Sequence, residues 1–320
     1  MDMIATLIRY RVGIILGLTL AVSAILVPGF VSLSTFSLGF DRGSTIGIVA
    51  IGLTVLLIAG KIDLSVGSVF AVTGIIAIML QPALGLWPAA FVGVLAGAVC
   101  GAFNGLLSVV FKVNALVATL ATMLIFRSIA HWLTDSQPQP GTDIMLSVRL
   151  ATVYFDLFTV RSALFLGAIL LLHVWLSRTI AGRNLFAVGS NPVAAEASGI
   201  SSDRITFLGF VFASTMAGIA GVLQSLATNT GSPVFGSEMT VAVIAAVVVG
   251  GTRIEGGRGS ALGTLGGVLT IAALTTAMEF QSVPAYVQRV VAGLILILLV
   301  VLDRTAPSGK RPRSAAVAAE

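Results

Sequence analysis

Ten long apolar runs divide this chain, and they limit its possible folds more than any other feature. The runs lie at about 12–30, 43–59, 66–80, 88–111, 113–133, 163–176, 205–227, 239–250, 261–278 and 284–302. Crossing a bilayer takes roughly 20 apolar residues in a helix, and the runs lack the two-residue alternation of membrane β-strands. The sequence therefore predicts an all-α integral membrane protein with about ten transmembrane helices.

The composition agrees with a membrane protein. Charged residues make up only 10% of the 320 residues, whereas they form about a quarter of an ordinary soluble domain. The net charge is +5, but the basic residues lie mostly near chain ends and in short connections, so we interpret them as orientation signals and expect no nucleic-acid partner. The single cysteine, Cys100, has no partner for an intramolecular disulfide.

Basic residues predict the orientation in the membrane. With a cytoplasmic N-terminus and ten spans, most of the 18 Lys and Arg residues fall on inner segments, and only Arg42, Arg149 and Arg161 fall on outer ones. Inner connections of membrane proteins carry such an excess of positive charge. Arg127 and Arg289 fall within nominal spans and stay unassigned. We therefore expect both termini to be cytoplasmic.

Acidic residues fall in connections or near the termini, and none lies in the middle of an apolar run. Asp63, for example, falls in the inner connection after the second run. An ion-coupled carrier usually keeps an ionisable group inside the membrane, at a cost of about 2.5–3.5 kcal/mol on insertion scales. The pattern counts against ion-coupled secondary transport, which remains the alternative because backbone carbonyls at broken helices can also bind sodium.

No motif for catalysis or nucleotide binding is present. Gly309-Lys310 is followed by arginine in a polar tail, so it is not a phosphate-binding loop, and the glycines at 256–263 lack dinucleotide-binding spacing. Neither His131 nor His173 stands in a metal-binding pattern. We expect no enzymatic activity, no cofactor and no metal site in this chain.

Small residues recur at four-residue spacing in several runs. Gly93, Gly97, Gly101 and Gly105 form one such stripe, and stripes of this kind let membrane helices approach closely. Asn104 lies at the edge of the stripe and needs a hydrogen-bond partner in lipid. It either bonds a neighbouring helix or faces a hydrated path.

Two short passages resemble one another, and each follows an apolar run that ends in glycine. Ile62-Asp63 and Ile254-Glu255 are each followed by a Gly-Ser pair and a later glycine at matching spacing. Glycine-interrupted helices in matching positions are a pointer to a transport site, and chance similarity is the alternative. The candidate residues for a translocation path or a helix break are Gly60, Asp63, Ser65, Gly67, Ser68, Asn104, Gly250, Gly251, Gly257, Gly259 and Ser260.

Four segments carry a family resemblance. They are LLIAGKIDLSVGS (56–68), GAFNGLL (101–107), AGRNLFAVGSNPVAAEASGI (181–200) and VVVGGTRIEGGRGSALGT (247–264). In this order and spacing, the chain resembles the permease subunits of bacterial ABC importers for monosaccharides, the ribose-type branched family. Lys61, Arg253 and Glu255 depart from the usual family pattern, so the resemblance does not identify the sugar.

The resemblance implies a ten-helix permease domain in residues 1–305 and alternating access driven by a separate ATPase. Residues 306–320 are expected to form a polar, disordered cytoplasmic tail. The implied partners are a second permease chain, identical or related, a cytoplasmic ABC ATPase that binds ATP and magnesium, and a periplasmic or lipid-anchored sugar-binding protein. The implied location is the bacterial inner membrane, and the implied cargo is a monosaccharide or related polyol.

The segment between the sixth and seventh runs is polar and helix-prone. In the family, the part that matches Gly189–Gly199 is the cytoplasmic loop that contacts the ATPase, which agrees with the side predicted from charge. The alternative is an amphipathic surface helix with no partner. The candidate docking residues are Gly189, Asn191, Ala195, Glu196 and Gly199.

Overall fold

The structure, a computed structural model, describes residues 11–305. The predicted tail at 306–320 lies outside the described residues, as do residues 1–10. Within the described range the chain folds into helices, their connections and one two-stranded antiparallel sheet. The prediction of an all-α membrane protein is confirmed at this level.

Each predicted apolar run contains a helix. The helices are α2 (Arg11–Leu26), α3 (Leu33–Ile58), α4 (Val66–Leu84), α5 (Leu86–Val109), α6 (Ala115–Leu133), α8 (Val160–Arg178), α11 (Ser202–Ala227), α12 (Met239–Val249), α13 (Ala261–Phe280) and α14 (Ala285–Thr305). Among the described residues, seven helices are long and apolar enough to cross a membrane, namely α3, α4, α5, α6, α8, α11 and α13. Helices α2, α12 and α14 contribute shorter apolar stretches, so the count of ten spans stays a prediction.

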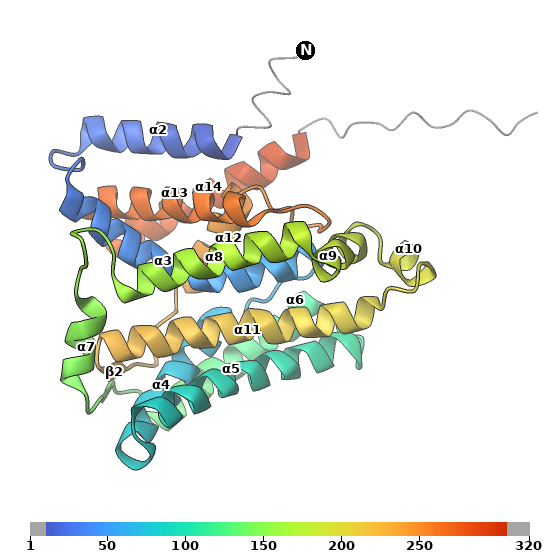
Figure 1. Ribbon diagram of the computed structural model, residues 1–320, viewed down its shortest axis with the longest axis horizontal. Helices are drawn as coiled ribbons and strands as arrows, with labels where there is room; N and C mark the ends of the chain where they lie inside the picture. Colours follow the sequence, from blue (N-terminus) through green and yellow to red (C-terminus); the bar gives the residue numbers. More distant parts are fainter. Residues whose placement is uncertain (1–10, 306–320) are drawn as a thin grey trace, which may run out of the picture.

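The remaining elements lie at the two ends of the bundle (Figure 1). Helix α7 (Ile144–Ala151) and the sheet of β1 (Gln139–Pro140) and β2 (Thr230–Gly231) occupy one end, where Gln139 pairs with Gly231. Helices α9 (Ile180–Ser190) and α10 (Pro192–Ala197) occupy the other end. The start of α2 and the end of α14 lie toward the α9–α10 end.

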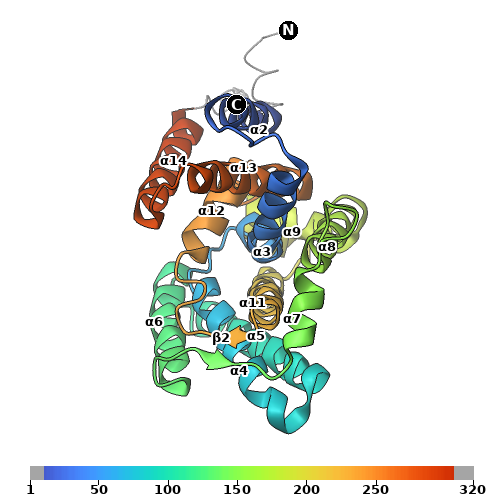
Figure 2. The ribbon, with the colours of Figure 1, turned by 90° about the vertical axis from the view of Figure 1, so that its left-hand side faces the viewer.

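Helix α3 runs near the centre of the bundle (Figure 2), and its second half is almost entirely buried. Apolar side chains of α3, α4, α12 and α13 form most of the main core cluster. Helices α5 and α11 pack through glycine: a Cβ added to Gly101 would lie 2.5 Å from the Phe210 carbonyl oxygen, and one added to Gly97 would lie 2.8 Å from that of Ser214. The predicted role of the α5 stripe in close packing is confirmed.

Helix α3 begins well before the apolar run that predicted it. Asp41 and Arg42, which the sequence places in an outer connection, lie inside α3. Asp41 pairs with Arg161 of α8, and Arg42 pairs with Glu279 of α13. Charged residues are accepted in an apolar helix when they are paired. A hydropathy pattern alone therefore underestimates the length of α3.

Candidate functional site

Helices α4 and α12 begin inside the bundle, where their N-termini meet. The Ser68 hydroxyl, in the first turn of α4, donates to the carbonyl oxygen of Met123 in the middle of α6, at 2.8 Å. The Thr240 hydroxyl of α12 accepts from the Gly67 N–H and donates to the Leu64 carbonyl oxygen, each at 3.2 Å. Irregular backbone at membrane depth is tolerated where protein surrounds it, and discontinuous helices mark transport sites. We call this meeting point, formed by residues 64–67 and 236–240, the half-helix junction.

A fully buried polar cluster lies beside the half-helix junction. The Asp63 carboxylate accepts hydrogen bonds from the Ser65 N–H at 2.8 Å, the Ser65 hydroxyl at 2.6 Å and the Ser214 hydroxyl at 3.2 Å. The Asn104 amide donates to Ser65 Oγ at 2.8 Å and to Asp63 Oδ2 at 3.3 Å. The side chains of this cluster are fully buried: Asp63, Ser65, Asn104 and Ser214. Of the two roles open to Asn104, the structure shows the bond to a neighbouring segment.

Asp63 differs from the sequence expectation in its burial, not in its place along the chain. It lies in the connection between α3 and α4, as the sequence predicts, but this connection folds into the bundle and buries the carboxyl group. Burial raises the pKa of the Asp63 carboxyl, while hydrogen bonds from Ser65, Ser214 and Asn104 act in the opposite direction. The carboxylate also lies at the N-terminus of α4, where the helix dipole favours a negative charge.

Arg127 of α6 is a second interior residue, and the sequence left it unassigned. Its guanidinium donates to the carbonyl oxygens of Pro233 at 2.5 Å, Phe235 at 2.7 Å and Gly67 at 3.1 Å. It thereby joins the connection before α12 to the first turn of α4. An arginine inside an apolar run is itself a signal of function, and this signal could have identified it.

The predicted path residues separate into two groups. Asp63, Ser65, Gly67, Ser68 and Asn104 gather around the half-helix junction, as the contacts above show. The other group lies around the connection between α12 and α13, and its members are Gly60, Gly250, Gly251, Gly257, Gly259 and Ser260. Within it, Ser260 caps α13 by accepting from the Gly263 N–H at 3.0 Å. The two similar passages thus do not form one site, although their glycine loops contact each other.

The predicted docking residues lie on α9 and α10. Asn191 accepts from the Ala194 N–H at 3.1 Å and so caps α10, and Gly199 ends this segment with φ of +80°. Asn191, Glu196 and Gly199 are exposed, whereas Ala195 is buried and Gly189 is partly buried. The exposed residues are available to a partner, and the other two contact the rest of the chain.

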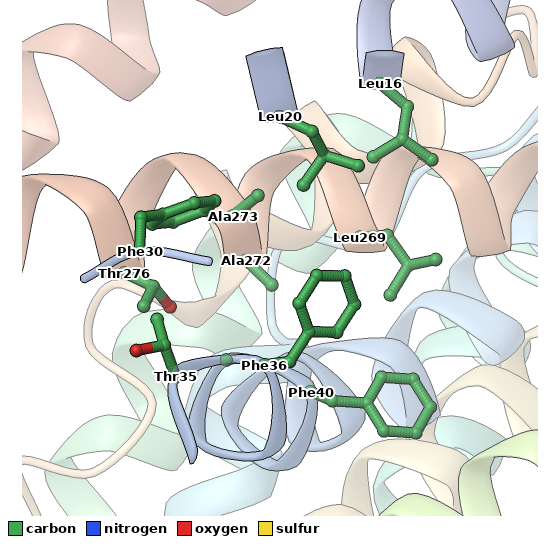
Figure 3. Close-up of a pocket in the computed structure, with 11 residues that line it drawn as sticks. Leu16, Leu20, Phe30, Thr35, Phe36, Phe40, Leu269, Ala272, Ala273 and Thr276 are labelled. Atoms are coloured by element: carbon green, nitrogen blue, oxygen red, sulfur yellow. The ribbon is translucent and has the colours of Figure 1, made fainter. Parts of the chain in front are cut away.

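Two cavities differ in the groups that they offer. One, of about 440 Å³, lies between the α3–α4 connection and α10, and Lys61, Lys112, Glu196 and Asp203 line part of it. The other, of about 70 Å³, lies between α2, α3 and α13 and is lined by side chains such as Leu16, Phe36 and Leu269 (Figure 3). The second cavity has only Thr35 and Thr276 as hydroxyl groups, so it does not suit a hydroxyl-rich ligand.

A helical bundle in which seven of the described helices are long and apolar enough to cross a membrane has the architecture of a multi-pass membrane protein. The chain belongs to the family described as branched-chain amino acid transport system / permease component, which matches residues 36–300. It is therefore a multi-pass permease of the bacterial inner membrane.

Curated relatives confirm the predicted resemblance to sugar permeases. The chain is 33% identical to the ribose import permease protein RbsC of Bacillus subtilis, over 81% of each chain. It is 31% identical to RbsC of Haemophilus influenzae over 93% of each chain. It is also 31% identical to the L-arabinose transport system permease protein AraH of Escherichia coli, over 95% of this chain and 92% of the relative. No solved structure matches the chain significantly.

Proposed function

We propose that this chain is the transmembrane permease subunit of an ABC importer for a monosaccharide or related polyol. The observation that carries the proposal is its identity to ribose and L-arabinose permeases along nearly the whole of both chains. The family description names branched-chain amino acids, but the relatives that align end to end are named for sugars. The cargo class follows these relatives.

The mechanism that we propose is alternating access with ten spans and both termini in the cytoplasm. The ends of α2 and α14 nearest the termini lie toward the α9–α10 end, which supports a common inner side. A separate ATPase binds ATP and magnesium and docks on the exposed face of α9 and α10, and this chain holds no cofactor. A sugar-binding protein docks at the opposite end, near α7, and the path lies between this chain and a second permease chain.

Ion-coupled secondary transport is the second candidate, and the buried Asp63 is the observation that favours it. A carboxylate inside a membrane bundle is a common element of ion coupling. Against this, both Asp63 oxygens already accept hydrogen bonds from groups of this chain. The carboxylate thus has hydrogen-bond partners on both oxygens without an added ion.

Uptake into proteoliposomes separates the two candidates. We expect radiolabelled sugar to enter only when the chain is reconstituted with its ATPase, its binding protein and ATP on the cytoplasmic side. Uptake by the chain alone under a sodium or proton gradient would instead support the secondary carrier. Calorimetry of the cognate binding protein against a sugar panel then identifies the cargo.

The docking role of Glu196 is tested by Glu196→Arg. We expect this change to weaken co-purification of the ATPase with the permease by about tenfold or more, because reversing an exposed charge at an interface costs binding free energy. Ser177→Ala is the control, since Ser177 is also exposed and its hydroxyl bonds only to carbonyls of its own helix. Unchanged association of the Glu196 variant would contradict the docking assignment.

A further inference from the structure

Three segments meet through glycine residues directly behind the docking helices. Gly60 belongs to the α3–α4 connection, Gly189 to the last turn of α9, and Gly256 and Gly257 to the α12–α13 connection. The Gly257 N–H donates to the Ile58 carbonyl oxygen at 2.9 Å. We call these four glycines the glycine node.

The contacts in the glycine node are made by main-chain atoms. A Cβ added to Gly189 would clash with the Ile58 carbonyl oxygen and lie 2.7 Å from the Gly257 nitrogen. A Cβ added to Gly256 would lie 2.8 Å from both the Gly189 oxygen and the Gly60 Cα. A flexible side chain could absorb a small displacement by changing rotamer, but close-packed backbone transmits it.

Two continuous routes lead from the glycine node to the half-helix junction. Along the first, Gly60 is followed within the same short connection by Asp63, which accepts from the Ser65 N–H immediately before α4. Along the second, the Gly256–Gly257 connection leads back to α12, whose Thr240 bonds both Gly67 and Leu64. Both routes thus start at the glycine node and end at the half-helix junction.

We propose that Gly189 is a positioning residue through which movement of the docking helices reaches the half-helix junction. This inference rests on the proposed function and adds to it the residue that couples the ATPase to the interior. Gly189 is not among the glycines with positive φ, so alanine there meets a steric obstacle from the two inner connections and no backbone strain. The exposed face of α10 stays unchanged.

Gly189→Ala in the full importer tests the inference. We expect the variant permease to co-purify with the ATPase as the unmodified chain does, while sugar uptake per ATP hydrolysed falls by about tenfold or more, a typical size for a lost coupling. Gly167→Ala is the matched control, because Gly167 is a helical glycine of α8 with nothing near its Cβ position. An unchanged ratio of uptake to hydrolysis in the Gly189 variant would overturn the inference.

Hydrogen exchange on the unmodified importer keeps the inference testable should the alanine variant not fold. Exchange is compared with and without a non-hydrolysable ATP analogue, in peptides covering residues 55–64, 187–199 and 250–259. We expect the ATP analogue to change the exchange rate in all three regions. A change in exchange confined to 187–199 would overturn the role of Gly189 and leave the proposed function standing. Failure of the unmodified complex to import sugar with ATP would contradict both the role of Gly189 and the proposed function.

Discussion

At the scale of single residues, the interior of this permease contains a small cluster of hydrogen-bonded polar groups. Ser65 is central among them, because its hydroxyl donates to Asp63 and accepts from Asn104. A buried polar group that loses its partner costs about 1–3 kcal/mol. The cluster is thus a point where a small change has a measurable effect.

Ser65→Ala is expected to lower the free energy of unfolding by about 1–3 kcal/mol, since it leaves the Asn104 amide and the Asp63 carboxylate each with one partner fewer. The measurement is thermal unfolding of the purified permease in detergent. Ser177→Ala serves as the control, because its hydroxyl is exposed and bonds only within α8. Equal melting temperatures for the two variants would show that the cluster contributes nothing to stability.

The sequence identified Asp63, Ser65 and Asn104 as candidates but not their mutual contacts. Asp63 and Asn104 are 41 positions apart, and Ser214 lies 151 positions from Asp63. Their contacts depend on the α3–α4 connection folding into the bundle, which no local pattern encodes. Arg127 carried a signal, an arginine inside an apolar run, but its partners are backbone carbonyls, which the sequence does not reveal.

At the scale of helices, hydropathy located every long helix but not every boundary. The start of α3 was missed because Asp41 and Arg42 find partners on α8 and α13, and such tertiary pairing is invisible in a hydropathy window. Stripe periodicity was more informative. It predicted which face of α5 approaches another helix, since only small residues allow backbones to come that close.

The contact between α5 and α11 can be tested with Gly101→Ala. The added methyl group would lie 2.5 Å from the Phe210 carbonyl oxygen and 2.8 Å from the Ser214 Cβ, so the helices must separate. We expect a loss of about 1–3 kcal/mol in the free energy of unfolding, the usual cost of overpacking, measured by thermal unfolding in detergent. Gly17→Ala in α2 is the control, because nothing lies near the Cβ position of Gly17, and we expect its effect on stability to be neutral or slightly favourable. If Gly101→Ala is equally neutral, tight packing between α5 and α11 is contradicted.

At the scale of the whole molecule, the proposed function requires that the two ends of the helix bundle face opposite compartments. The α7 end exposes Ile144, and the α9–α10 end exposes Val193. Positive charge predicts that the second end is cytoplasmic. The family could be predicted from four short segments, whereas the position of each end relative to the membrane needs direct measurement.

Cysteine labelling measures this orientation. In a background with Cys100→Ala, we expect Ile144→Cys to react with a membrane-impermeant maleimide in spheroplasts and Val193→Cys to react only after permeabilisation. With the permease expressed without its partner proteins, both side chains are well exposed, at 69% and 77%, so access to the reagent and not burial decides the result. Labelling of Val193→Cys in sealed spheroplasts would reverse the assignment of the inner side.

The glycine node has one more consequence. Its contacts join carbonyl oxygens, amide groups and α-carbons, and they leave no room for a Cβ at Gly189 or Gly256. Under the inference drawn for Gly189, this coupling uses no cargo-binding side chain, so side chains elsewhere in the chain can be exchanged without altering it. The same inference predicts that related permeases with different cargoes keep glycine at these positions.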